Sequence, residues 1–315
     1  MEIIKQNKLA ISILLLLSAA SLTSEIYAEV QEVETVTIIG TKADVKELPG
    51  SGTIVSNEEL QKAMDTDIHK ILSAVPGVYF RTEDGYGLRP NISIRGTSID
   101  RSAKITLMED GILVAPAPYT SSSAYYFPTT GRINSVEVLK GPSSISQGPS
   151  TIGGAINMIS TPIPEVASGK LTQEFGQNGM LRTHAYYGGV SGNFGGLVEV
   201  HEHQSDGFDS IANVGGDTGF DKSDFMMKAR YENGDHSLTF KMVEIDEVSD
   251  QSYVGLSGKS FNANPRLRYG MTQYDQMSND GDQKSLTYLG DFEKFKVLAS
   301  SWSNDYHRDW FKVDK

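Results

Sequence analysis

The sequence lacks cysteine and long apolar runs, and each absence excludes a class of protein. Without thiols the chain forms no disulfide and offers no thiolate for catalysis, zinc or iron–sulfur binding. After residue 22 no apolar run approaches the ~18 residues that a membrane-spanning helix needs. Basic clusters are also missing: 28 Lys and Arg stand against 40 Asp and Glu, for a formal net charge of -12. A polytopic helical membrane protein is therefore excluded, and the acidic charge argues against a nucleic-acid partner.

Residues 1–28 have the layout of a secretory signal peptide. Lys5 and Lys8 precede the apolar run Leu9–Ala20, and the small residue Ala28 stands where cleavage would fall. We expect cleavage before Glu29; the alternative is an N-terminal membrane anchor. Export combined with the lack of cysteine is typical of a bacterial envelope protein that does not rely on disulfides.

Residues 29–46 are expected to form a periplasmic tail that contains a strand-forming segment. This segment consists of Thr35, Val36, Thr37, Ile38 and Ile39, and it contains no proline. β-Branched residues near a chain terminus can add as a strand to the sheet edge of a partner. An equally good interpretation is a first strand of the domain that follows.

Residues 47–164 are expected to form a compact α+β domain. Ser56 and Glu59 have the spacing of a capping box, and a second helix is predicted over residues 67–74. Short strands are predicted at residues 78–81, 92–95, 105–108, 136–140 and 155–160. The long connections between them are rich in Gly, Pro, Ser and Tyr, and such connections usually carry function.

Residues 165–315 alternate between apolar and polar positions over longer segments. Phe225, Met227, Ala229 and Tyr231 fall on one face of a strand, for example. Tight turns such as residues 233–235 alternate with long polar loops, above all residues 248–282. This pattern predicts antiparallel transmembrane β-barrel strands, although alternation alone would also describe a soluble β-sandwich.

Five phrases of the α+β domain resemble, in this order and spacing, the plug of the TonB-dependent outer-membrane receptors. They are Val75-Pro76-Gly77-Val78, Ile92-Ser93-Ile94-Arg95-Gly96, Leu107-Met108-Glu109-Asp110-Gly111, Val136-Glu137-Val138-Leu139-Lys140-Gly141-Pro142 and Gly153-Gly154-Ala155-Ile156-Asn157. Residues 35–39 then resemble the TonB box of that family. The resemblance implies an α+β plug domain followed by barrel strands, a location in the bacterial outer membrane, and TonB and outer-membrane lipid as partners.

Within the family, the resemblance is closest to receptors of the ferric dicitrate type. Residues 85–91, 115–119, 126–132 and 253–269 carry it. It implies uptake of an iron(III) chelate such as ferric citrate, with the iron carried as ligand and no resident cofactor. The alternatives are another metal–siderophore complex, or a non-transporting surface receptor or adhesin on the same scaffold. The tail leaves no room for the signalling domain that some such receptors carry.

Ferric citrate complexes are anionic, and guanidinium groups bind carboxylates in a bidentate manner. The candidate ligand-binding residues are Tyr86, Arg89, Arg101, Tyr119, Arg266 and Arg268. Arg95 and Arg132 lie inside motif phrases near strands, and we interpret both as structural ion-pair formers.

No enzyme and no metal site are predicted. His201 and His203 share a strand face, but without a third ligand they are better interpreted as polar residues of a barrel lumen. Glu109 and Asp110 belong to a turn rather than to a catalytic carboxylate pair, and no nucleophile has a placed base.

The length itself suggests an incomplete barrel. Residues 165–315 accommodate about seven strands, whereas barrels of plugged transporters have about 22. An open sheet would leave unpaired edges in lipid. We therefore expect the chain to be the N-terminal part of a receptor.

Overall fold

The computed structural model describes residues 36–39, 44–46, 48, 50–114, 123 and 126–313, which fall into two compact units. The first unit comprises the described residues up to Pro162 together with residues 304–306, and the second comprises residues 163–303 and 307–313. The predicted signal peptide, Thr35 and Tyr119 lie outside the described residues. None of the helices in the described ranges is long and apolar enough to span a membrane.

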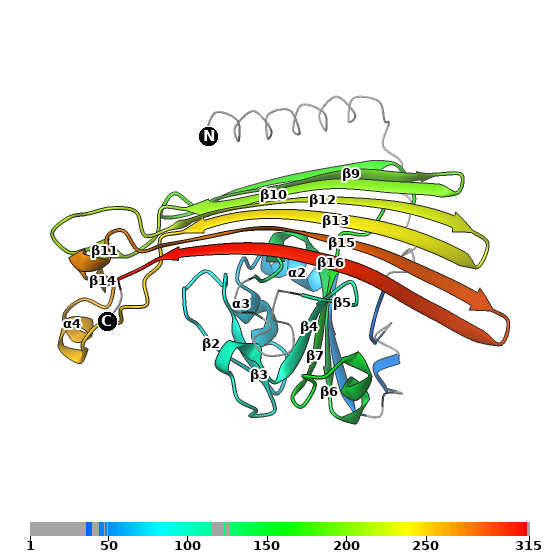
Figure 1. Cartoon of the computed structure of the whole chain (residues 1–315), viewed down its shortest axis with the longest axis horizontal. Coiled ribbons are helices and arrows are strands. Elements are labelled where there is room, and N and C mark those ends of the chain that lie inside the picture. The colour runs from blue at the N-terminus through cyan, green and yellow to red at the C-terminus, as the bar shows by residue number, and fades with distance from the viewer. Residues whose placement is uncertain are drawn as a thin grey trace. The chain divides into compact units, whose positions relative to one another are not determined.

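The first unit combines a five-stranded mixed sheet with a separate hairpin and short helices (Figure 1). In the sheet the strands follow the order β1-β6-β7-β4-β5, and β4 and β7 are parallel while the other neighbours are antiparallel. The sheet strands are β1 (Ser51–Val55), β4 (Ile105–Glu109), β5 (Ile112–Leu113), β6 (Ile133–Lys140) and β7 (Gly154–Ser160). The hairpin is β2 (Val78–Arg81) with β3 (Asn91–Ile94), and the α-helices are α2 (Asn57–Ala63) and α3 (Ile68–Ser73). The 3-10 helices are η1 (Asp44–Lys46), η2 (Asp100–Ser102), η3 (Thr130–Arg132) and η4 (Pro142–Gln147).

All five strands and both helices predicted for this unit are present. The capping box at the start of α2 is formed, with the Ser56 amide donating to Glu59 Oε2 at 2.8 Å. Asp67 caps α3 by accepting a hydrogen bond from the His69 amide. Strand β1 was not among the predicted strands, because its Ser-Gly start carries little strand propensity.

The second unit is dominated by seven long antiparallel strands that lie side by side (Figure 1). Their order is β16-β15-β13-β12-β10-β9-β8, so each long strand pairs with its neighbours along the chain. They are β8 (Ser168–Phe175), β9 (Leu181–Ser191), β10 (Phe194–Ser205), β12 (Phe220–Asn233), β13 (His236–Ser249), β15 (Gln276–Phe292) and β16 (Phe295–Phe311). Two short strands, β11 (Ser210–Ile211) and β14 (Leu267–Arg268), join two loops in parallel, and α4 (Gly258–Ala263) lies in the longer loop.

The predicted loop over residues 248–282 is shorter than expected. Strand β13 continues to Ser249 and β15 already begins at Gln276. Residues 278–282 have no apolar side chain on either face of the strand, so sequence alternation does not reveal them. The predicted fold class, an α+β plug followed by antiparallel strands of an incomplete barrel, is confirmed.

Strand β12 buries charged side chains and turns large apolar ones to the other face of the sheet. On β12 the buried positions include Lys222, Asp224 and Lys228, whereas Phe225 and Met227 point to the opposite, less buried face. A soluble sandwich would bury the apolar face instead, whereas transmembrane barrels are polar inside and apolar outside. The polarity of this sheet therefore supports the barrel over the sandwich.

Two ion pairs on the buried face join residues of neighbouring strands. Lys222 lies opposite Glu247, with 3.6 Å between its ammonium nitrogen and Oε2 of the carboxylate. Arg182 forms an ion pair with Glu174, which lies opposite it on β8. Such cross-strand pairs stabilise a sheet and offset part of the cost of burying charge.

Arg132 forms the predicted structural ion pair in the first unit. Its guanidinium donates to both carboxylate oxygens of Glu109, at 3.0 Å to Oε2, and to the hydroxyl of Tyr126 at 2.8 Å. Both charged side chains are completely buried. Glu109 therefore binds an arginine and Asp110 forms the turn after β4, as expected of a structural rather than a catalytic pair.

The interpretation of Arg95 as an ion-pair former stays a prediction. No residue that the structure describes forms an ion pair with it, and its backbone is left-handed, at a φ of 55°. Its charge adds to the effect of burial in lowering the pKa of Lys140, whose ammonium donates to Pro76 O at 2.9 Å.

Replacing Glu109 by alanine should strongly destabilise the first unit, because it leaves the buried guanidinium of Arg132 without a counter-charge. Breaking such a pair costs about 3 to 5 kcal/mol. Urea-dependent hydrogen exchange at the amides of β4 and β6 would measure the loss. Glu58→Ala is the control, because it removes the exposed pair with Lys62 and should cost less than about 1 kcal/mol. Equal effects of the two substitutions would contradict this assignment.

Candidate functional site

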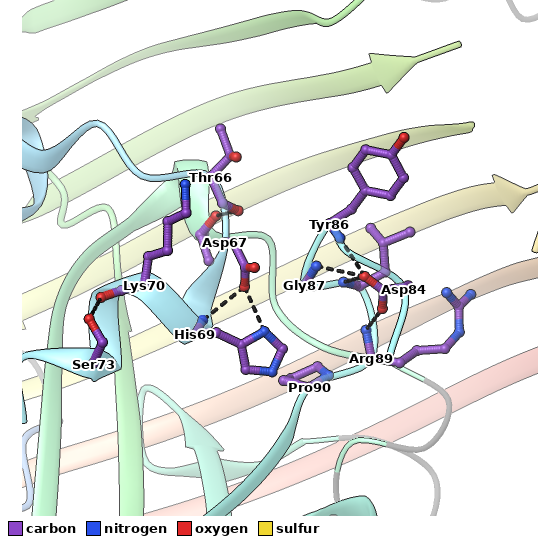
Figure 2. Close-up of polar contacts among 12 residues, drawn as sticks. Thr66, Asp67, His69, Lys70, Ser73, Asp84, Tyr86, Gly87, Arg89 and Pro90 are labelled. Carbon is purple, nitrogen blue, oxygen red and sulfur yellow. Dashed lines mark hydrogen bonds and ion pairs between the residues drawn. The ribbon is translucent and has the colours of Figure 1, made fainter. Parts of the chain in front are cut away.

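The loop between β2 and β3 is organised around the carboxylate of Asp84 (Figure 2). Its Oδ1 accepts hydrogen bonds from the amides of Tyr86 (2.6 Å), Gly87 (2.7 Å) and Leu88 (3.3 Å). Its Oδ2 accepts a fourth bond from the amide of Arg89 at 2.8 Å. A loop has no strand partner for these amides, so the carboxylate satisfies donors that would otherwise depend on water. Asp84 thereby sets the backbone that presents Tyr86 and Arg89.

Gly87 brings this loop against the start of α3. Its φ is +77°, and a Cβ at this position would come within 2.4 Å of Asp67 Oδ1, so no other residue fits without a shift. Burial works to raise the pKa of Asp67, but hydrogen bonds from His69 and the charges of His69 and Lys70 outweigh it and hold the pKa below its usual value. Figure 2 shows Asp67 and His69 beside the loop, on a helix whose apolar residues are buried.

The predicted residues of the first unit lie in adjacent loops. Tyr86 is half-buried, Arg89 is only 8% exposed, and Arg101 is half-buried in η2. The amide of Arg101 donates to Asn91 Oδ1 at 2.8 Å, directly after the loop that carries Arg89. The structure therefore brings the backbones at Arg89 and Arg101 together.

Arg268 is committed to the architecture of its own loop. Its guanidinium donates to Thr272 O at 2.6 Å, Thr272 Oγ1 at 2.9 Å and Asp275 O at 3.2 Å, and also to Asp250 O. Burial lowers its pKa, an effect that the nearby carboxylates of Asp275, Asp250 and Asp209 oppose. This geometry favours a role in holding the loop together over direct contact with a ligand.

Arg266 is placed differently, since its side chain is exposed. Its guanidinium carbon lies 5.9 Å from the centre of the Phe208 ring, a cation–π geometry. The loop between β10 and β12 is joined to the loop that carries Arg266, because the Ser210 amide donates to Arg266 O at 2.8 Å. Of the two predicted loop arginines, Arg266 is the one whose guanidinium faces solvent.

The described part of the predicted TonB box, residues 36–39, is docked on the first unit. The Glu137 carboxylate accepts hydrogen bonds from two consecutive amides, that of Ile38 on Oε2 at 2.8 Å and that of Ile39 on Oε1 at 3.0 Å. Asn157 Nδ2 donates to Val36 O at 3.0 Å and to Glu137 Oε2 at 3.0 Å. Ile39 is buried in an apolar cluster with Met108, Leu139 and Ala155.

Neither interpretation of this segment describes its structure fully. Residues 36–39 are not a strand, so they are not a first strand of the domain, and Ile39 is only 7% exposed. The expectation of a free tail is corrected for these four residues. Sequence propensity cannot foresee the docking, because the hydrogen-bond partners lie about 100 residues further along the chain.

His201 and His203 lie on the buried face of β10, as predicted. The ring of His201 lies 5.9 Å from that of His184 and 6.4 Å from that of His203, and its Nδ1 is 4.0 Å from Asp224 Oδ2. Within the described ranges, no group of three or more His, Asp or Glu side chains could hold a metal ion.

Sequence reasoning missed the polar residues that organise the site. Asp84, Asn91, Ser102, Glu137 and Asn157 hold the loops and the docked segment, yet none of them was singled out. Glu137 and Asn157 were visible as polar side chains at positions where a doubly buried strand is expected to be apolar. That mismatch is the sequence signal that could have identified them.

Comparison with known proteins agrees with the fold. Residues 44–155 match the family model described as TonB-dependent Receptor Plug Domain. The vitamin B12 transporter BtuB of Photobacterium profundum is 24% identical over 309 residues, covering 92% of this chain and 50% of the relative. The chain thus spans half the length of this relative.

Two solved structures are similar in fold. The ferric citrate transporter FecA in its unliganded form has a TM-score of 0.74 at 21% identity, over 90% of this chain and 44% of that one. The ferric yersiniabactin uptake receptor FyuA from Yersinia pestis has a TM-score of 0.72 at 22% identity, over 86% and 43%. These relatives are named for transport and uptake, which agrees with the prediction that the chain is not an enzyme. Their named ligands differ, so the similarity supports the fold without selecting a ligand.

Replacing Asp84 by alanine should loosen the loop, because four amides lose a charged acceptor. A loss of about 2 kcal/mol corresponds to about 30-fold faster hydrogen exchange at residues 86–89. Asp84→Asn keeps one acceptor oxygen and should have a smaller effect. Glu58→Ala is the control, since it removes an exposed carboxylate that pairs with Lys62 within α2. Unchanged exchange in Asp84→Ala would contradict the organising role.

Proposed function

We propose that this chain, which carries a TonB-dependent receptor plug domain, provides the plug and seven wall strands of an outer-membrane receptor that takes up an anionic iron(III) chelate with energy from TonB. The observation that carries the proposal is the combination of this plug with a long antiparallel sheet in which β12 buries Lys222, Asp224 and Lys228 and turns Phe225 and Met227 to the other face. Such a sheet suits the lipid of the bacterial outer membrane, the location that the family match supports.

Ferric citrate is the chelate that the arginines suit best. A complex of iron with citrate presents several carboxylates, and guanidinium groups bind carboxylates through paired hydrogen bonds. Arg89 and Arg101 lie in adjacent plug loops, and Arg266 presents an exposed guanidinium in the longest loop of the sheet unit. Iron enters this scheme as cargo within the chelate and not as a cofactor of the protein.

Uptake of another metal chelate is the second candidate. The similarity to a vitamin B12 transporter extends over 92% of this chain, so a cobalt-containing ligand must be tested beside the iron chelate. Neutral cobalamin has no cluster of carboxylates for the arginines to bind. The charge of the binding loops therefore distinguishes the two candidates.

The docked segment at residues 36–39 gives the receptor a contact for TonB. Addition of this segment as a strand to a partner would use every second backbone amide along it, and therefore that of Ile38 or that of Ile39. Both amides are bound to Glu137 in the docked arrangement. Docking on the plug through both amides and pairing with TonB through either of them are therefore mutually exclusive.

Titration of the full chain with ferric citrate tests the ligand. Arg89→Ala and Arg266→Ala should each weaken binding about tenfold, the equivalent of one charge-assisted contact of about 1.4 kcal/mol. Lys62→Ala on α2 and Lys259→Ala on α4 are controls that remove an exposed cation from each unit. Unchanged affinity in both arginine variants would eliminate the proposed site, and binding of cyanocobalamin alone would replace the iron chelate by cobalamin.

A single introduced cysteine can report the docking of residues 36–39, because the chain has no other thiol. Cysteine at position 39, in Ile39→Cys, should react slowly with a maleimide because the site is buried. Adding Glu137→Ala removes the acceptor of two amides and should accelerate the reaction at least about tenfold, with a smaller increase for Glu137→Gln. Adding the exposed control Glu58→Ala should change nothing. Equal rates with Glu137→Ala and Glu58→Ala would show that Glu137 does not hold the segment.

A further inference from the structure

A buried group of polar residues joins two loops of the plug beside the candidate ligand-binding residues. We call Pro90, Asn91, Ser102 and Ser123 the loop hub. Ser102 is completely buried, Asn91 is 1% exposed and Ser123 is 2% exposed. Buried polar groups are retained in a fold when their hydrogen bonds are satisfied, and this group is satisfied almost entirely by residues of different loops.

Ser102 occupies the centre of the loop hub. Its hydroxyl donates to Pro90 O at 3.1 Å and accepts a hydrogen bond from the Ile92 amide at 3.0 Å. The hydroxyl of Ser123 lies 3.0 Å from that of Ser102 and also contacts Pro90 O. One side chain thus ties η2 to the end of the 82–90 loop and to Ser123.

Asn91 adds a second connection between the same loops. Its Oδ1 accepts from the Arg101 amide at 2.8 Å, and its Nδ2 donates to Glu83 Oε2 at 2.7 Å. The two halves of one amide side chain therefore hold residues on both loops. Since Asn91 begins β3, the connection is anchored in a hydrogen-bonded hairpin.

The backbone at η2 is strained in a way that needs such support. Arg101 and Ser102 have φ values of 49° and 55°, two consecutive non-glycine residues in the left-handed region. This conformation costs free energy and persists only where the surroundings impose it. Strain of this kind is typical of sites where a side chain must be presented in one fixed arrangement.

Each candidate arginine directly precedes a hub residue in the sequence. Arg89 precedes Pro90, and Arg101 precedes Ser102, so the backbone beside each arginine is fixed by the same hydrogen bonds. We propose that Ser102 is a positioning residue that makes Arg89 and Arg101 act as one unit on a single anionic chelate. The role rests on the proposed function, because it concerns the same ligand, and it deepens that function by naming what sets the spacing of the two cations.

A double-mutant cycle measures whether the two arginines act together. With Ser102 present, removal of either arginine should weaken binding of ferric citrate about tenfold, and removal of both should weaken it by well under the hundredfold that independent sites would give. In Ser102→Ala, the affinity for ferric citrate should fall about tenfold. In this variant the losses of affinity caused by removing each arginine should multiply when both are removed, as they do for independent sites. Ser102→Gly, which relieves the strained backbone but also lacks the hydroxyl, should behave like Ser102→Ala. Ser93→Ala, at another buried serine on β3, is the control and should bind normally.

Hydrogen exchange without ligand separates this role from the proposed function. Ser102→Ala should accelerate exchange at residues 86–89 and 99–103 together, while the amides of β6 and β7 remain protected. Acceleration confined to residues 99–103, or affinity within twofold of the unmutated chain, would overturn the role of Ser102. Loss of protection throughout β6 and β7 would also overturn it, because Ser102 would then support the whole fold. An unmutated chain that exchanges as expected but binds no ferric citrate would overturn the proposed function instead.

Discussion

The plug depends on carboxylates that accept hydrogen bonds. Their donors are N–H groups that have no partner within the strands and helices of the plug. Asp84 accepts hydrogen bonds from four amides of one loop, and Glu137 accepts them from two amides of the docked segment. Asp110 accepts the Ser160 amide at 2.9 Å, and Glu109 binds the buried guanidinium of Arg132. Because irregular backbone cannot satisfy itself, a domain with long loops needs such acceptors at fixed points. The apolar core packs around these points.

The sheet unit solves a different problem with the same chemistry. Its buried face carries charge, and two cations pair in register with a carboxylate on the neighbouring strand, Arg182 with Glu174 across β8–β9 and Lys222 with Glu247 across β12–β13. Its other face carries the apolar residues that would form the core of a soluble protein. The reversed polarity of the two faces distinguishes a transmembrane barrel from a soluble sandwich. Alternation in the sequence alone cannot reveal which face is buried.

The regular elements could be predicted from the sequence because their signals are local. The capping box of α2, the cap of α3 and the turn at Gly234 each depend on residues within a few positions of one another. The site could be predicted only in part. Charge and resemblance point to Arg89 and Arg101 as candidates, but Asp84, Asn91 and Ser102, which hold the backbone beside them, act through hydrogen bonds that no periodicity encodes. Arg268 shows the converse, since its charge suggested a ligand and its four acceptors all belong to its own loop.

The order of strands in the two sheets has a consequence for how the chain folds. Each long strand pairs with the strand that precedes or follows it among the long strands, so its contacts close short stretches of chain. In the plug, β1 at residue 51 pairs with β6 ending at residue 140, and the sheet cannot close until that later strand is available. Non-local pairing of this kind is slow because the entropy of closing the intervening loop opposes it. Hairpins of the seven long strands are therefore expected to form faster than the sheet of the plug. Residues 36–39 can dock only after β6 and β7 have paired, because that pairing brings Glu137 and Asn157 together.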